Sequence, residues 1–93
     1  MNIEPQESVI TGRWIVVDGD IQRDEACQRI ERLTQTYLVR VASDASGWDT
    51  LFRDPADDRL WELIYPESDL HGGGPPELRC MSEQEARGKY AGV

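Results

Sequence analysis

The segment from Tyr65 to Pro76 contains the chain's only histidine and the residue types best suited to chemistry. Its run His71-Gly72-Gly73-Gly74 is of the kind that supplies backbone N–H donors to an oxyanion in lipase-type hydrolases, and Asp69 is the acidic residue that hydrolysis would use with His71. That chemistry also needs a Gly-x-Ser-x-Gly nucleophile elbow on a sheet of many parallel strands, and the 93-residue chain has no such elbow. We therefore predict no catalytic residue and no enzymatic activity, and hydrolysis by His71 and Asp69 is the least favoured hypothesis.

The same loop is poorly suited to a phosphate or a metal ion. It lacks the Lys-Ser/Thr that follows a P-loop, and the nearby Glu67, Asp69 and Glu77 would repel a phosphate. One histidine and two separated cysteines cannot make the paired spacing of a structural zinc site, and the acidic run 54–58 lacks the spaced ligands of an EF-hand loop. We predict no cofactor and no metal, and expect a rigid crossover in which glycines free the backbone, prolines stiffen it, and His71 bonds within the loop or faces a partner.

The net charge of −8, from 18 acidic and 10 basic side chains, narrows the class of partner. It disfavours binding to nucleic acid or to an anionic membrane, so neither is expected as a partner. A positively charged protein is the natural inference. The alternative is that the acidity only keeps the domain soluble.

Most of this charge lies between Asp44 and Asp69, a segment with eight acidic residues and two basic ones. Because successive strand ends can bring loops to one side of a sheet, we expect its carboxylates to form an acidic patch. Aromatic residues lie among them, and we expect Trp61 and Phe52 in the core, with Tyr65 or Trp48 as candidates for an exposed anchor. The predicted partner-binding residues are Asp54, Asp57, Asp58, Tyr65, Glu67, Asp69 and His71.

The length allows one modest core, so we predict a single domain over residues 1–93, with residues 1–8 as a loose lead-in. The two cysteines, Cys27 and Cys80, lack the number and spacing of a disulfide framework and are expected to be reduced and half-buried. No basic start precedes an apolar run, and no stretch approaches 18 apolar residues, so neither a secretory signal nor a membrane span is expected. The expected location is the cytoplasm.

Hydrophobic periodicity predicts an α+β fold. Apolar residues at spacings of three and four predict a helix over about 22–36, reached through the turn 18–20 and capped by Asp20 or Asp24. β-branched and aromatic residues predict strands over 9–17, 37–43, 48–53, 60–65 and 77–81, and the short turns 44–47 and 54–58 favour antiparallel hairpins. Ser82 and Glu85 form a capping-box pattern for a short C-terminal helix that ends near Lys89. The expected architecture is an antiparallel sheet of four to five strands packed on the long helix.

Four motifs follow one another between residues 47 and 76: Gly-Trp, Leu-Phe-Arg-Asp-Pro, Trp-Glu-Leu with Tyr-Pro, and His-Gly-Gly-Gly-Pro-Pro. At these spacings they resemble the immunity protein 27 family of bacterial polymorphic toxin systems, and the likeness extends to residues 11–14 and to the helix around Cys27. The family pattern has Asp-Gly-Arg at the hairpin turn, where this chain has Asp57-Asp58-Arg59. That difference removes a glycine and adds a carboxylate, so the turn type there is open.

The resemblance implies a small intracellular antidote, made beside a toxin gene, that binds its cognate toxin and protects the producing cell. The leading hypothesis is an immunity protein that neutralises this toxin through an acidic surface, by occluding or distorting the toxin's active site. A nuclease is the suggested target because its substrate-binding face would be basic. The alternative is an acidic adaptor or a DNA-mimic regulator of another basic protein.

Overall fold

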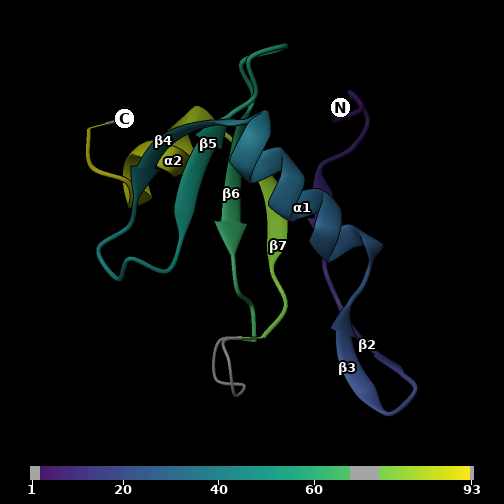
Figure 1. Cartoon of the computed structure of the whole chain (residues 1–93). Coiled ribbons are helices and arrows are strands. Elements are labelled where there is room, and N and C mark those ends of the chain that lie inside the picture. Colours follow the sequence, from purple (N-terminus) through teal and green to yellow (C-terminus); the bar gives the residue numbers. More distant parts are fainter. Residues whose placement is uncertain (1–2, 68–73, 93) are drawn as a thin grey trace.

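A computed structural model of the chain describes residues 3–67 and 74–92. Within these residues the chain forms two helices and seven strands (Figure 1). The strands are β1 (Val9–Thr11), β2 (Trp14–Val17), β3 (Asp20–Arg23), β4 (Val39–Ser43), β5 (Thr50–Arg53), β6 (Leu60–Ile64) and β7 (Glu77–Met81), and the helices are α1 (Glu25–Thr36) and α2 (Glu83–Lys89).

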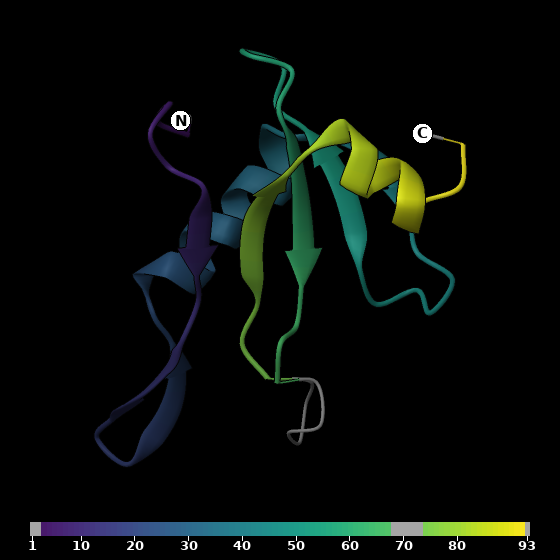
Figure 2. The same ribbon diagram turned by 180° about the vertical axis from the view of Figure 1, so that it is seen from behind.

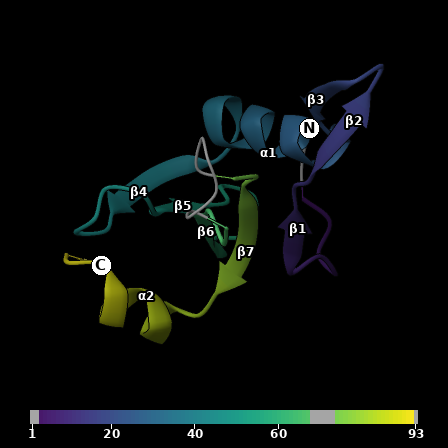
Figure 3. The ribbon, with the colours of Figure 1, turned by 90° about the horizontal axis from the view of Figure 1, so that it is seen from below.

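Five of the strands form one antiparallel sheet in the order β1-β7-β6-β5-β4. Because side chains alternate along a strand, Phe52 and Trp61 point to the face that α1 covers, whereas Leu51 and Leu60 point to the face that α2 covers. Figure 3 shows the two helices on opposite sides of the sheet, and Figure 2 shows α2 from its own side. The predicted α+β fold is confirmed, and the antiparallel sheet has five strands where four to five were expected.

Helix α1 carries the apolar stripe that the sequence predicts, with Cys27, Ile30 and Leu33 buried against the sheet. Of the two predicted caps, Asp24 is the one used, because its carboxylate accepts a hydrogen bond from the Cys27 N–H at 2.8 Å. The helix therefore begins at Glu25, three residues later than predicted. Cys27 is fully buried at 1% exposure, whereas Cys80 is half-buried, and both are free thiols.

The C-terminal helix α2 has the predicted capping box. The Ser82 hydroxyl accepts from the Glu85 N–H at 3.1 Å, and the Glu85 carboxylate accepts from the Ser82 N–H at 3.0 Å. Ala86 and Tyr90 of this segment pack on Leu51 and close the second face of the sheet. The cap and the end of the helix at Lys89 are thus confirmed.

The predicted single strand over 9–17 is wrong, because the chain leaves the main sheet at Gly12. The Gly12 N–H donates to the Pro76 carbonyl at 2.9 Å, and a β-carbon at this position would lie 2.6 Å from Cys27 Sγ. Residues 9–11 therefore pair with β7, whereas residues 14–17 pair with β3 in a separate two-stranded sheet.

The β2–β3 hairpin turns at Asp18 and Gly19, whose φ angles are 52° and 85°. Positive φ at both central residues is what a two-residue type I′ turn requires, and Asp-Gly is a favoured pair for it. Residues 20–23, which the sequence analysis assigned to a turn and the start of the helix, are the second strand of this hairpin. In Figure 1 the hairpin projects from the body beside the N-terminal end of α1.

The predicted loose lead-in is also wrong for residues 3–8. Ile3 is 5% exposed within the main core, and the Glu7 carboxylate forms two hydrogen bonds of 2.7 Å with Arg29 of α1. The Arg59 guanidinium also donates to the Glu7 carbonyl at 2.8 Å. The segment is therefore fastened to both the helix and the β5–β6 turn.

Candidate functional site

The predicted acidic residues do not form one patch. Asp57 and Asp58 lie in the turn between β5 and β6, whereas Tyr65 and Glu67 follow the other end of β6. Consecutive connections of an antiparallel meander leave opposite ends of the sheet, and Figure 1 shows these two segments at the top and the bottom of the view. Asp69 and His71 lie outside the described residues.

Asp54, one of the predicted contact residues, is buried, with an exposure of 1%. Its Oδ1 accepts a hydrogen bond of 2.7 Å from the Tyr37 hydroxyl and one of 2.8 Å from the Ala56 N–H. The first bond joins the end of α1 to the β5–β6 turn, and the second shapes the turn itself. The same bond to Asp54, with burial, raises the pKa of Tyr37. Asp54 therefore has a structural role.

Asp57 and Asp58 are exposed but are already paired within the turn. Asp57 accepts from the Arg59 N–H at 3.0 Å and from its guanidinium at 2.7 Å, and these bonds lower the pKa of Asp57. Asp58 lies 3.0 Å from Arg53 and has φ of 62°. It thus adopts, without glycine, the left-handed conformation that the Asp-Gly-Arg pattern would supply at this position.

At the other end of the sheet, Trp48 and Tyr65 form an aromatic pair. Their rings meet edge to face with centroids 5.8 Å apart, and Trp48 remains 55% exposed. The loop that presents Trp48 is organised by Asp44, whose carboxylate accepts from the Ser46 hydroxyl at 2.7 Å and the Gly47 N–H at 3.0 Å. These bonds lower the pKa of Asp44. As expected, Trp61 and Phe52 are in the core, at 0% and 6% exposure.

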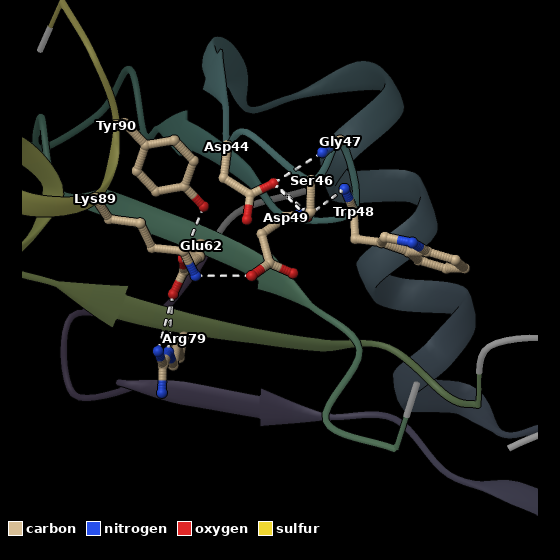
Figure 4. A network of polar contacts seen from close by, with 9 residues as sticks. All are labelled: Asp44, Ser46, Gly47, Trp48, Asp49, Glu62, Arg79, Lys89 and Tyr90. Carbon is tan, nitrogen blue, oxygen red and sulfur yellow. Dashed lines mark hydrogen bonds and ion pairs between the residues drawn. The ribbon is translucent and has the colours of Figure 1, made fainter. Parts of the chain in front are cut away.

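Beneath this loop lies a buried carboxylate, Glu62, which is 0% exposed. It contacts Arg79 at 3.0 Å, Lys89 Nζ at 2.5 Å and the Tyr90 hydroxyl at 2.7 Å (Figure 4). Burial by itself would raise the pKa of Glu62, but the bonds from Lys89, Tyr90 and Arg79 outweigh it and hold the pKa below its usual value. The carboxylate is therefore ionised and fully paired, as a buried charge must be.

Lys89 connects this buried carboxylate to the loop, because Nζ also lies 2.7 Å from the carboxylate of Asp49. Burial would lower the pKa of Lys89, but its bonds to Asp49 and Glu62 outweigh that effect and raise it. An open pocket of about 400 Å³ lies here, and its lining residues are Ser46, Trp48, Asp49, Ile64, Tyr65, Pro66, Arg79 and Lys89. The exposed Trp48 and the half-buried Tyr65 thus border a pocket with charges of both signs.

Ion pairing leaves an unbalanced negative surface. Among the described residues, seven of the chain's ten cationic side chains are in ion pairs with carboxylates. Within residues 3–67 and 74–92, exposed carboxylates without an ion pair include Asp18, Asp20, Glu25 and Glu67. Of these, only Glu67 was among the predicted contact residues. Asp18 and Asp20 form the tip of the β2–β3 hairpin, which the sequence analysis did not identify as a hairpin.

Two further features can be checked in the described part of the chain. No group of three or more His, Cys, Asp or Glu side chains is arranged to hold a metal ion there. Within the same residues, no helix has the length and apolar character needed to cross a membrane.

Comparison with known proteins gives one family. No curated protein and no solved structure matches the chain. The family model for immunity protein 27 matches residues 16–82, from the β2–β3 hairpin to the cap of α2. Because that match covers most of the chain, as the linked motifs of its sequence led us to expect, the protein belongs to the immunity protein 27 family, and its role is to neutralise a toxin.

Proposed function

We propose that this immunity protein acts by binding, without catalysis, and that its toxin is a basic protein such as a nuclease. The proposal is supported by the net charge of −8 together with carboxylates that form no ion pair within the described residues, Asp18, Asp20 and Glu67 among them. A nuclease domain carries a cationic face for its substrate, and opposite potentials accelerate the encounter of two such proteins. An antidote benefits from fast association because the toxin acts as soon as it is free.

The observation that carries the proposed surface is the exposure of Trp48. Trp48 has 55% of its surface in solvent, whereas tryptophan is highly buried on average, and tryptophan is among the residues most enriched at interface hot spots. The Asp44 loop and the Tyr65 ring hold Trp48 in one position, beside a pocket in which Asp49, Arg79 and Lys89 offer polar contacts. We therefore place the centre of the toxin contact at Trp48 and Tyr65.

The test uses the toxin domain encoded beside the gene for this chain. Wild-type protein should bind that domain and restore growth when the two are co-expressed. Trp48→Ala should weaken binding about 30-fold or more, the effect of losing one hot-spot residue of about 2 kcal/mol, whereas Trp48→Phe should retain most of the affinity. Asp58→Asn, at the opposite end of the sheet, is the matched control and should bind like wild type.

The toxin, the contact surface and the charge of the toxin face can each be refuted by a different result. Failure of the wild-type protein to bind or protect against this domain would remove the assigned toxin. Full affinity in Trp48→Ala would remove the proposed contact surface while leaving the family role intact. An association rate that does not fall as salt is raised from 50 to 500 mM, a range chosen to shorten the Debye length to a few ångströms, would exclude a basic toxin face.

A further inference from the structure

The β2–β3 hairpin has no covering layer in the described structure. Among residues 3–67 and 74–92 its two strands pair only with each other, so both outer edges are unpaired there, and all eight strand residues are exposed. Figures 1 and 3 show it standing away from both the main sheet and α2. An isolated two-stranded hairpin is only marginally stable in water, because neither of its faces is packed.

The hairpin exposes more apolar side chains than is usual for a segment surrounded by solvent. Val16 and Ile21 lie opposite each other on one face and are 72% and 69% exposed. Ile15 and Val17 point to the other face and are 42% and 38% exposed. Exposed strands normally carry polar residues on their solvent side, so this concentration of β-branched apolar side chains indicates a surface that another molecule covers.

Two backbone hydrogen bonds attach the base of the hairpin to the rest of the protein. The Gly12 N–H bonds to Pro76 at 2.9 Å, and the Asp24 N–H bonds to the Arg13 carbonyl at 3.1 Å. Trp14 lines two open pockets, of about 380 and 450 Å³, one of which it shares with Glu67 and the other with Tyr65. The hairpin is therefore continuous with the surface proposed above for the toxin.

Charge identifies the kind of partner. The tip carries Asp18 and Asp20, and neither carboxylate has an ion pair within the described residues. A second copy of this chain would bring another net charge of −8 to the contact, whereas a basic partner would neutralise the tip. A partner surface complementary to the hairpin would be an apolar recess, with cationic side chains where the tip of the hairpin lies.

We propose that the β2–β3 hairpin is a contact arm of the antidote, which places Val16 and Ile21 in an apolar recess of the toxin and Asp18 and Asp20 against the toxin's cationic side chains. This inference rests on the proposed function. It adds a second contact region that adjoins the one at Trp48 and Tyr65, and a mode of binding in which the unpaired edge of β2 is available to pair with a strand of the toxin.

The experiment compares three double variants with wild type for binding to the toxin domain encoded beside the gene. Val16→Thr with Ile21→Thr keeps β-branched side chains and removes apolar surface. Asp18→Asn with Asp20→Asn removes charge, and Asn-Gly suits the type I′ turn as well as Asp-Gly does. The matched control is Val39→Thr with Val41→Thr on edge strand β4, where both valines are 42% exposed. Circular dichroism and thermal unfolding check that each variant is folded.

We expect each hairpin variant to weaken binding tenfold or more, with the charge variant losing its effect at high salt, and the β4 control to bind like wild type. Amide hydrogen exchange of the wild-type protein should show protection of residues 14–23 when the toxin domain is added. Wild-type affinity in both hairpin variants, or no added protection at 14–23, would overturn the contact arm while the proposed function stands. Equal losses in the hairpin and β4 variants would also overturn it, and absence of binding by wild type would overturn the proposed function itself.

Discussion

Replacement of Gly12 by alanine should destabilise the protein at the point where the chain leaves the main sheet for the hairpin. Gly12 is buried and does not have the positive φ that glycine alone favours, so what the position requires is space. An alanine β-carbon would lie 2.6 Å from Cys27 Sγ and 2.7 Å from the Pro76 carbonyl oxygen. The second contact cannot relax easily, because the same carbonyl accepts the Gly12 N–H at 2.9 Å.

The loss of stability in Gly12→Ala can be estimated from how far the neighbouring atoms must move. Ordinary contacts of a β-carbon begin near 3.4 Å, so two neighbours must each move by several tenths of an ångström. Overpacking of a close-packed interior typically costs about 1–3 kcal/mol, and the involvement of a backbone group places Gly12→Ala in the upper half of that range. For a domain of this size, each kcal/mol lowers the melting temperature by roughly 4–8 °C.

Gly88→Ala is the matched control, because it is the same substitution in a helix with nothing within 4 Å of the new β-carbon. It should raise stability by about 0.5–1 kcal/mol, so the two variants should shift the melting temperature in opposite directions. Urea unfolding followed by circular dichroism measures both. A Gly12→Ala protein as stable as wild type would refute the account of why β1 and β2 separate. The double variant Gly12→Ala with Cys27→Ala should be less destabilised than the sum of the two single variants, since it removes one of the two close contacts.

Three further predictions concern local interactions. Asp58→Gly should raise the free energy of unfolding by about 0.5–1 kcal/mol, because glycine adopts φ near 60° without strain and the lost exposed ion pair contributes little; a decrease in urea unfolding would contradict this. Tyr37→Phe should lower it by about 1.5–3 kcal/mol, since the buried Asp54 carboxylate loses a hydrogen bond, and an unchanged midpoint would mean that this bond is not formed. Glu7 has its pKa lowered to about 2 by its hydrogen bonds with Arg29, so its stabilisation is complete above pH 4.5 and is lost as the pH falls toward 2; Glu7→Gln should flatten this part of the pH–stability curve, and a variant with the wild-type slope would refute the assignment.

The sequence predicted the main sheet and both helices because each carries its own local signal. The stripe of Cys27, Ile30 and Leu33 determines the buried face of α1, and the Ser82 capping box determines the start of α2. The hairpin also had a local signal, the Asp18-Gly19 pair between β-branched residues, but the apolar run from Val9 was interpreted as one strand. The break at Gly12 depends on Cys27 and Pro76, which are distant in sequence, so no local pattern shows it.

The candidate site was less predictable than the fold for a related reason. Acidic residues are visible in a sequence, but whether a carboxylate faces solvent or bonds inward depends on tertiary contacts. Asp54 lies in an acidic turn and is nevertheless buried against Tyr37, while Asp18 and Asp20 lie outside the acidic segment and have no ion pair in the part of the chain that the structure describes. Antiparallel topology alone implies that the connections before and after β6 leave opposite ends of the sheet. Their acidic residues therefore cannot form a single patch.

Lys89 connects helix α2 to the loop that presents Trp48. One ammonium group is bonded to Glu62 in the sheet and to Asp49 beside Trp48, so the loop is ordered before any partner arrives (Figure 4). Association then does not have to pay the entropy of immobilising that tryptophan, and the affinity of the antidote depends in part on its C-terminal segment. Substitutions in α2 that never touch the toxin should therefore alter how long the complex lasts.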